Sequence, residues 1–89
     1  MSATQVKAVA ATGDITTKDA YLRSVVLTGG SDAATVVVRA GGSGGTVILT
    51  LKAATATTAP AVFGRAFCGS GIHVTVTGTA PAVTVEYEA

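Results

Sequence analysis

The sequence predicts an all-β protein, a compact antiparallel β-sandwich or barrel of about 6–8 short strands with an extended N-terminal arm. The first observation is composition, because alanine, valine, threonine and glycine dominate the chain and the β-branched valine and threonine suit a pleated sheet. The second is an alternation of apolar and polar residues with a period of two in four segments. The third is the position of the glycines, which fall between those segments.

The four alternating segments are residues 34–40, 46–52, 72–77 and 83–88. In each segment, alternate apolar side chains share one face of the expected strand, and that face is the expected core side. These side chains are Ala34, Val36, Val38 and Ala40; Val47, Leu49 and Leu51; Ile72, Val74 and Val76; and Val83, Val85 and Tyr87.

Two further segments predict strands with a weaker pattern. Residues 20–28 are apolar on both faces, as in a strand that is buried on two sides. Residues 61–67 lie between Pro60 and Gly69, and Gly64 in their middle predicts a bulge or bend.

The beginning of the chain has little pattern. Val6 and Val9 are too few to anchor a short helix, so residues 1–19 are expected to form an extended arm, with residues 15–17 as a candidate short strand. The predicted organisation is therefore an arm at 1–19 and a single β domain at 20–89.

Glycine-rich connections at residues 29–33, 41–45 and 78–81 predict hairpins of a meander. The run GGSGGT at 41–46 is not expected to bind phosphate. A phosphate loop needs a lysine and a following helix, whereas Thr46 and Val47 begin a strand.

The composition favours self-association. A chain of 89 residues buries only about 60–65% of its unfolded surface, so its own core is marginal. One cysteine and one histidine exclude a disulfide framework and nearly exclude a zinc site, and charged residues make up only 12% at a mean hydropathy of +0.56. The expected route to stability is oligomerisation.

Other partner classes are not expected. The net charge is +1 and the basic residues are scattered, so nothing favours nucleic acid. No apolar run approaches the length of a membrane span, and Lys7 interrupts the N-terminal segment, so neither a membrane protein nor a secretory signal is expected.

No catalytic, cofactor-binding or metal-binding residue is expected. The run FCGSGIH holds Cys68, Ser70 and His73, but a nucleophilic site also needs a group that orients the base, and none is adjacent. Cys68 is expected in the core, and His73 in a solvated or interface position. Glu86 and Glu88 are read as a charged sheet edge that discourages stray pairing, and Asp32 as a turn residue.

The candidate interface residues are Val6, Val9, Arg23, Arg39 and His73. Arg23 and Arg39 lie among apolar neighbours on expected strands. Each is either a surface side chain whose stem covers apolar area or half of an ion pair between subunits.

The run YLRSVVLTGGSDAATVVVRAGGSGGTVILTLKA, followed by GIHVTVTGTAPAVTVEYE, resembles small all-β virion proteins of tailed bacteriophages and prophages. The matching elements are Leu27 to Val36, Gly41 to Lys52, Gly71 to Thr79 and Val83 to Glu88, within about residues 20–88. The resemblance is a pattern of strands and turns, and it does not extend to the first 19 residues.

This resemblance implies a capsid decoration or cement protein that is made in the host bacterial cytoplasm and located in the virion. Its expected partners are further copies of itself, with a trimer favoured, and the major capsid protein or another virion protein. The alternatives are a neck, tail or fibre component, a glycan- or receptor-binding module and, last, an enzyme.

Overall fold

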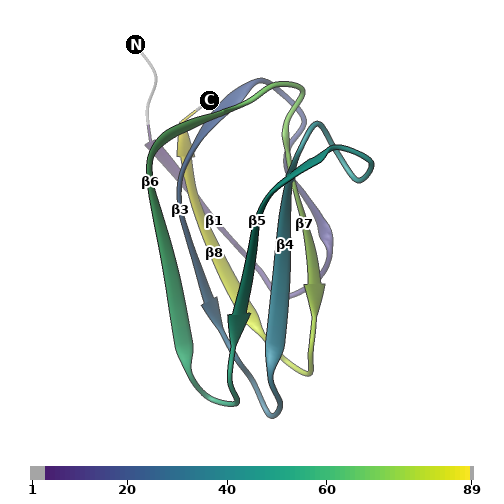
Figure 1. Ribbon diagram of the computed structural model, residues 1–89, viewed down its shortest axis with the longest axis vertical. Helices are drawn as coiled ribbons and strands as arrows, with labels where there is room; N and C mark the ends of the chain where they lie inside the picture. The colour runs from purple at the N-terminus through teal and green to yellow at the C-terminus, as the bar shows by residue number, and fades with distance from the viewer. Residues whose placement is uncertain (1–3, 89) are drawn as a thin grey trace.

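The protein is a two-layer β-sandwich in a computed structural model that describes residues 4–88 (Figure 1). Its strands are β1 (Thr4–Val9), β2 (Gly13–Thr16), β3 (Ala20–Thr28), β4 (Ala34–Ala40), β5 (Thr46–Ala53), β6 (Thr58–Cys68), β7 (Ile72–Thr77) and β8 (Ala82–Glu88). One sheet has the order β1-β8-β3-β6 and the other β2-β7-β4-β5. All pairings are antiparallel, so the predicted fold class is confirmed as a sandwich.

The core lies between the two sheets and is built by the predicted alternation. Val36 and Val38, Ile72 and Val74, and Val83 and Val85 have no exposed surface. They come from β4, β7 and β8, and each pair is separated by a residue on the opposite face of its strand. Burial of these faces against each other is the main source of stability for a domain of this kind.

The connections differ from the predicted meander. Only β4 and β5 are both consecutive in the chain and paired within the described residues, so the loop at 41–45 is a hairpin as expected. The loops at 29–33 and 78–81 instead carry the chain from one sheet to the other, so the hairpins predicted there are wrong. A glycine-rich turn can form either a hairpin within one sheet or a crossing between two sheets. The crossing is selected because each sheet must bury its apolar face against the other.

Bulges shift the alternation in two strands. The register of β3 slips between Leu22 and Ser24, so Leu22 and Val25 both face the core and the strand is buried on one face rather than two. In β5 a bulge lies opposite the step from Val38 to Arg39, and Val47 beyond it is 49% exposed, which corrects its predicted core position.

The irregularity predicted at Gly64 is confirmed. Leu22 pairs with Ala66 and Ser24 pairs with Val62, so three residues of β6 bulge out opposite one residue of β3. Pro60 lies within β6, which is tolerated because β6 is an edge strand and proline cannot donate a ladder hydrogen bond.

Most of the predicted arm lies in the two sheets. β1 pairs with β8 at one edge of the first sheet, and β2 pairs with β7 at one edge of the second. Residues 1–3 lie outside the described part of the chain. The division of the chain into an arm at 1–19 and a domain at 20–89 stays a prediction.

Candidate assembly surface

A charged cluster lies on the outer face of the first sheet. Arg23 on β3 donates a hydrogen bond from Nη1 to Oε2 of Glu88 at 2.6 Å, and its Nε lies 3.9 Å from Oε1 of Glu86. Arg65 on β6 approaches the same Glu88 oxygen with its Nε at 3.6 Å. The hydrogen bond and charge of Glu88 raise the pKa of Arg23 above its ordinary value, so the Arg23 guanidinium stays charged at all physiological pH values.

The cluster bears on two sequence predictions, the sheet edge expected at Glu86 and Glu88 and the ion pair considered for Arg23. Glu86 and Glu88 do not lie on a sheet edge, because β8 pairs with β1 on one side and β3 on the other. Arg23 already has two carboxylate partners in its own chain. Arg23 therefore forms its ion pairs within one chain, although about two fifths of its side chain (39%) is still exposed.

An aromatic group continues this face toward the edge strand β6. The rings of Tyr21 and Phe67 have their centroids 5.3 Å apart at an interplanar angle of 58°. The guanidinium carbon of Arg65 lies 3.9 Å from the centroid of the Tyr21 ring, in cation–π geometry. Because the Arg65 guanidinium stacks on the Tyr21 ring, the exposed aromatic surface is mainly that of Phe67, which is 58% exposed.

The edge strand β6 exposes apolar side chains. Val62 is 83% exposed, the highest value among the large hydrophobic residues of the described chain, and Phe67 on the same strand is also exposed. Only one edge of β6 is paired, with β3, so the backbone groups of its other edge are free of a strand partner among the described residues. An apolar edge with little charge is a template for pairing with another chain.

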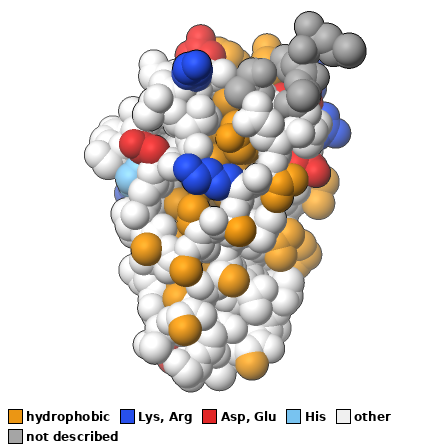
Figure 2. Space-filling model, turned by 180° about the vertical axis from the view of Figure 1, so that it is seen from behind, with side chains coloured by type: hydrophobic (Ala, Val, Ile, Leu, Met, Phe, Trp, Pro, Cys, Tyr) orange, Lys and Arg blue, Asp and Glu red, His pale blue; other side chains and the backbone are white. Residues whose placement is uncertain are grey.

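Surface charge is unevenly distributed. Figure 2 shows the face opposite the view of Figure 1, where most charged side chains lie in the upper half and the lower half presents hydrophobic and uncharged side chains. A surface of this kind costs little to desolvate in a protein contact, since few charges must lose water.

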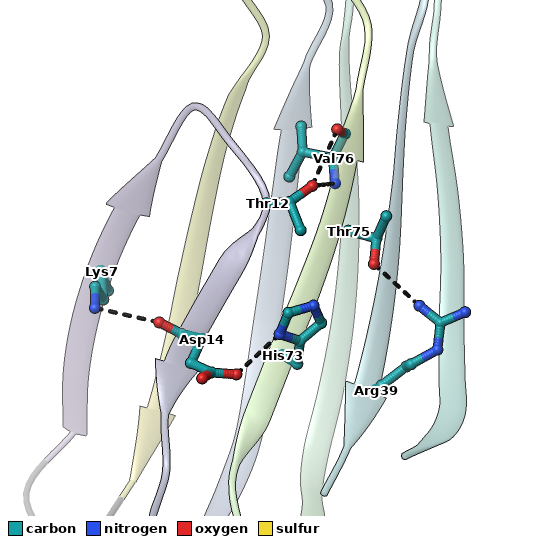
Figure 3. Close-up of polar contacts among 7 residues, drawn as sticks. All are labelled: Lys7, Thr12, Asp14, Arg39, His73, Thr75 and Val76. Carbon is teal, nitrogen blue, oxygen red and sulfur yellow. Dashed lines mark hydrogen bonds and ion pairs between the residues drawn. The ribbon is translucent and has the colours of Figure 1, made fainter. Parts of the chain in front are cut away.

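A second polar group lies on the outer face of the other sheet, near β2 (Figure 3). The Nδ1 atom of His73 and Oδ1 of Asp14 are 2.8 Å apart, and Arg39 donates from Nη1 to the hydroxyl of Thr75 at 3.0 Å. His73 is only 7% exposed, although a solvated or interface position was expected. It alternates with core residues and faces outward, but β2 pairs alongside it and brings Asp14 against the ring.

Four of the five predicted interface residues lie on the outer faces of the two sheets, and the fifth, Val9, lies on the inner side. Val6, 64% exposed, pairs with Glu86 and belongs to the same face as Arg23. Val9 packs partly against the core. Arg39 and His73 are cross-strand partners on the opposite sheet. Their role as interface residues stays a prediction.

The sequence prediction missed the accessible part of β6, namely Val62, Arg65 and Phe67. One signal was available, because Pro60 marks β6 as an edge strand and the alternate residues after it are apolar. The bulge at residues 63–65 hides this signal, since it changes which side chains share a face.

The residues considered for nucleophilic chemistry are not assembled into a site. Cys68 has no exposed surface and lies in the core, whereas His73 faces outward from the other sheet. Burial raises the pKa of the Cys68 thiol, which keeps it in the less nucleophilic protonated form. Among residues 4–88 there is no pocket, no group of three side chains suited to a metal ion, and no helix long and apolar enough to cross a membrane.

The geometry therefore defines a small β-sandwich whose accessible features are sheet edges and an aromatic and charged face. The sequence matches no protein-family model and no curated protein. A solved structure from Bacillus endospore appendages, described as a novel family of disulfide-linked pili, is similar to this chain with a TM-score of 0.54 and 25% sequence identity. The match covers 99% of this chain and 85% of the appendage chain.

Proposed function

We propose that this protein is a non-enzymatic structural subunit that associates with copies of itself in a larger assembly. The observation that carries the proposal is the edge strand β6, with its unpaired backbone edge and the exposed side chains of Val62 and Phe67. The similarity to a subunit of endospore pili supports the same class of role.

The mechanism that we propose is pairing between sheet edges. An edge strand of a second copy would add to β6, so that main-chain hydrogen bonds provide affinity and the side chains at Val62 and Phe67 provide apolar contact. When the added strand is β1, β2 or β5 of the second copy, the contact joins different surfaces of the two copies, and its repetition produces a ring or an open filament. The limited core of an 89-residue chain would gain buried area in the assembly.

A fibre or filament component is the form that we favour, because the similar solved structure is that of a pilus protein. That relative is described as disulfide-linked. Cys68 is fully buried here, so the proposed contacts are noncovalent and do not use this thiol.

A capsid decoration protein is the second candidate. It is favoured by the resemblance of residues 20–88 to small virion proteins of tailed bacteriophages, and it implies a trimer that docks on the major capsid protein in a virion. In this candidate the outer face that carries Val6 and Arg23 is the expected contact surface, because Val6 is 64% exposed.

Light scattering after chromatography over a range of protein concentrations tests self-association. We expect the mass to rise with concentration, and Val62→Lys to reduce that rise by placing a charge on the β6 edge. The matched control is Thr77→Lys, which places the same charge on an exposed residue of the central strand β7 and should assemble normally. A mass that stays at that of one chain at all concentrations contradicts the proposal.

Electron microscopy of the concentrated protein separates the two candidates. Filaments that contain only this chain support the fibre component. Discrete oligomers that bind to assembled phage capsids support the decoration protein.

A further inference from the structure

The strand β1 is attached to the sandwich differently from the other three edge strands. β2, β5 and β6 each place a fully packed side chain in the core, namely Ile15, Ala53 and Cys68, which are at most 4% exposed. None of the six residues of β1 is buried, and only Val9 packs partly against the core. Side-chain burial therefore contributes little to holding β1 in place.

The attachment of β1 consists mainly of backbone pairing. Its six residues pair in register with β8, from Thr4 opposite Glu88 to Val9 opposite Val83. The side chains that point toward the inner side include Lys7, whose Nζ donates to the carbonyl oxygen of Asp14 at 3.4 Å (Figure 3). These contacts depend on the β8 edge and on β2, and a second copy of the chain offers both in identical form.

The segment that follows β1 is held firmly. Ile15 is 4% exposed, Asp14 contacts His73, and the backbone N–H of Val76 donates to the hydroxyl of Thr12 at 2.9 Å. Residues 10–12, between β1 and β2, are exposed and outside any strand. The chain thus has an anchor at residues 12–16, an exposed connection at residues 10–11, and a strand before that connection with little buried surface.

The edge of β8 beneath β1 can accept a strand from another copy. Val83 and Val85 of β8 belong to the core with no exposed surface, and β1 satisfies the backbone groups along that edge. A β8 edge without a partner strand would be an open sheet edge, which is a template for pairing with another strand. The strand that fits this edge in length and register is β1, and every copy of the chain carries one.

We propose that β1 is an exchangeable strand, and that in the assembly the β1 of one copy pairs with β8 of a second copy in the register seen within one chain. Exchange of an identical element between copies recovers every contact that it breaks, so it needs little additional binding energy. When the β1 strand of each copy pairs with β8 of the next copy, the exchange links the copies into an open filament. The inference rests on the proposed self-assembly and specifies how neighbouring copies are joined within it.

Variants of the full chain that each gain one cysteine beside the buried Cys68 test the exchange. Ala8 and Thr84 are direct partners in the register of β1 and β8. Ala8→Cys and Thr84→Cys proteins are mixed, assembled and oxidised, and the disulfide-linked products are separated by mass. We expect a heterodimer of the two variants, because exchange places the thiol introduced at position 8 of one copy opposite the thiol introduced at position 84 of another.

A mixture of Thr4→Cys and Thr84→Cys is the register control, since Thr4 pairs with Glu88 instead. It should give little heterodimer. The wild-type protein should give no cross-link under the same oxidation, because Cys68 is buried. Equal cross-linking in both mixtures would show random collision and would overturn the exchange.

The double variant Ala8→Cys/Thr84→Cys supplies an independent readout. When it is oxidised as a dilute monomer, the disulfide locks β1 onto its own β8. Assemblies of this locked form should dissociate promptly on dilution, whereas assemblies of the reduced form should persist, because an exchanged strand must unpair before copies separate. Equal persistence would contradict the exchange.

The outcomes separate this inference from the proposed function. Assembly without the specific heterodimer overturns the exchange and leaves self-association through β6 standing. A protein that neither assembles nor cross-links overturns both. A specific heterodimer together with normal assembly of Val62→Lys supports the exchange and overturns the role of the β6 edge.

Discussion

The carboxylate of Asp32 accepts two hydrogen bonds from Thr79, one from its backbone N–H at 2.7 Å and one from its hydroxyl at 3.0 Å. Asp32 follows β3 and Thr79 follows β7, so the pair joins two crossings between the sheets at one end of the sandwich. The backbone N–H of Ser31 donates to the carbonyl oxygen of Thr79 at 3.2 Å and adds to the same junction. The residue expected only to shape its own turn therefore connects two distant parts of the chain.

Replacement of Asp32 should weaken this junction. We expect Asp32→Ala to lower the free energy of unfolding by about 1 kcal/mol, because both hydrogen bonds to the carboxylate are lost at a solvent-exposed site. Asp32→Asn keeps one acceptor oxygen and should cost less. Urea denaturation measures both, and an Asp32→Ala protein as stable as wild type would contradict the structural role of the pair.

Gly30 is required by a close approach at the same junction. A Cβ atom at this position would lie 2.2 Å from the carbonyl oxygen of Thr79 and 2.3 Å from that of Ala80. Gly30→Ala should therefore force the two crossings apart and cost more than about 2 kcal/mol. The matched control is Gly44→Ala in the β4–β5 hairpin, where a Cβ meets nothing within 4 Å and the change should be within about 0.5 kcal/mol. Thermal unfolding of the two variants distinguishes them, and similar melting temperatures would contradict the packing at Gly30.

Two valines of opposite burial test the position of the core. Val85 has no exposed surface, whereas Val62 is 83% exposed. Val85→Ala should lower the free energy of unfolding by about 1–3 kcal/mol, because it removes two buried methyl groups and leaves a cavity. Val62→Ala should change the unfolding of the dilute protein by less than about 0.5 kcal/mol. The prediction fails if the two denaturation midpoints shift equally.

The thiol of Cys68 should be protected by the fold. Burial raises its pKa, so the native thiol stays protonated while that of the unfolded chain ionises near pH 8.5–9. The raised pKa makes stability fall as the pH rises above the value for the unfolded thiol. We expect slow labelling by a thiol reagent at pH 8 and rapid labelling in denaturant. Cys68→Ala should lose part of the stability decrease above pH 9, whereas rapid labelling of the native protein would contradict the buried position.

Several features of the candidate surface follow from the sequence only in part. Gly64 predicted an irregular strand, and the structure places it in the bulge of β6, whereas Pro60, predicted to bound that strand, lies inside it. The exposure of Val62 and Phe67 did not follow, because the bulge between them changes the phase of the alternation. A bulge depends on how two strands fit together, and no local residue pattern specifies it reliably.

The sequence by itself determined the all-β class, the strands at residues 34–40, 72–77 and 83–88 with their core faces, and the burial of Cys68. These properties are local, since a period of two in apolar residues selects a strand and identifies the face that must leave water. Only the tertiary structure decided that the loops at 29–33 and 78–81 cross between sheets, and that β8, with Glu86 and Glu88, is a central strand. The physical reason is that strand neighbours are chosen by long-range pairing of backbone edges and by the fit of two apolar faces, and glycine-rich connections permit several such arrangements.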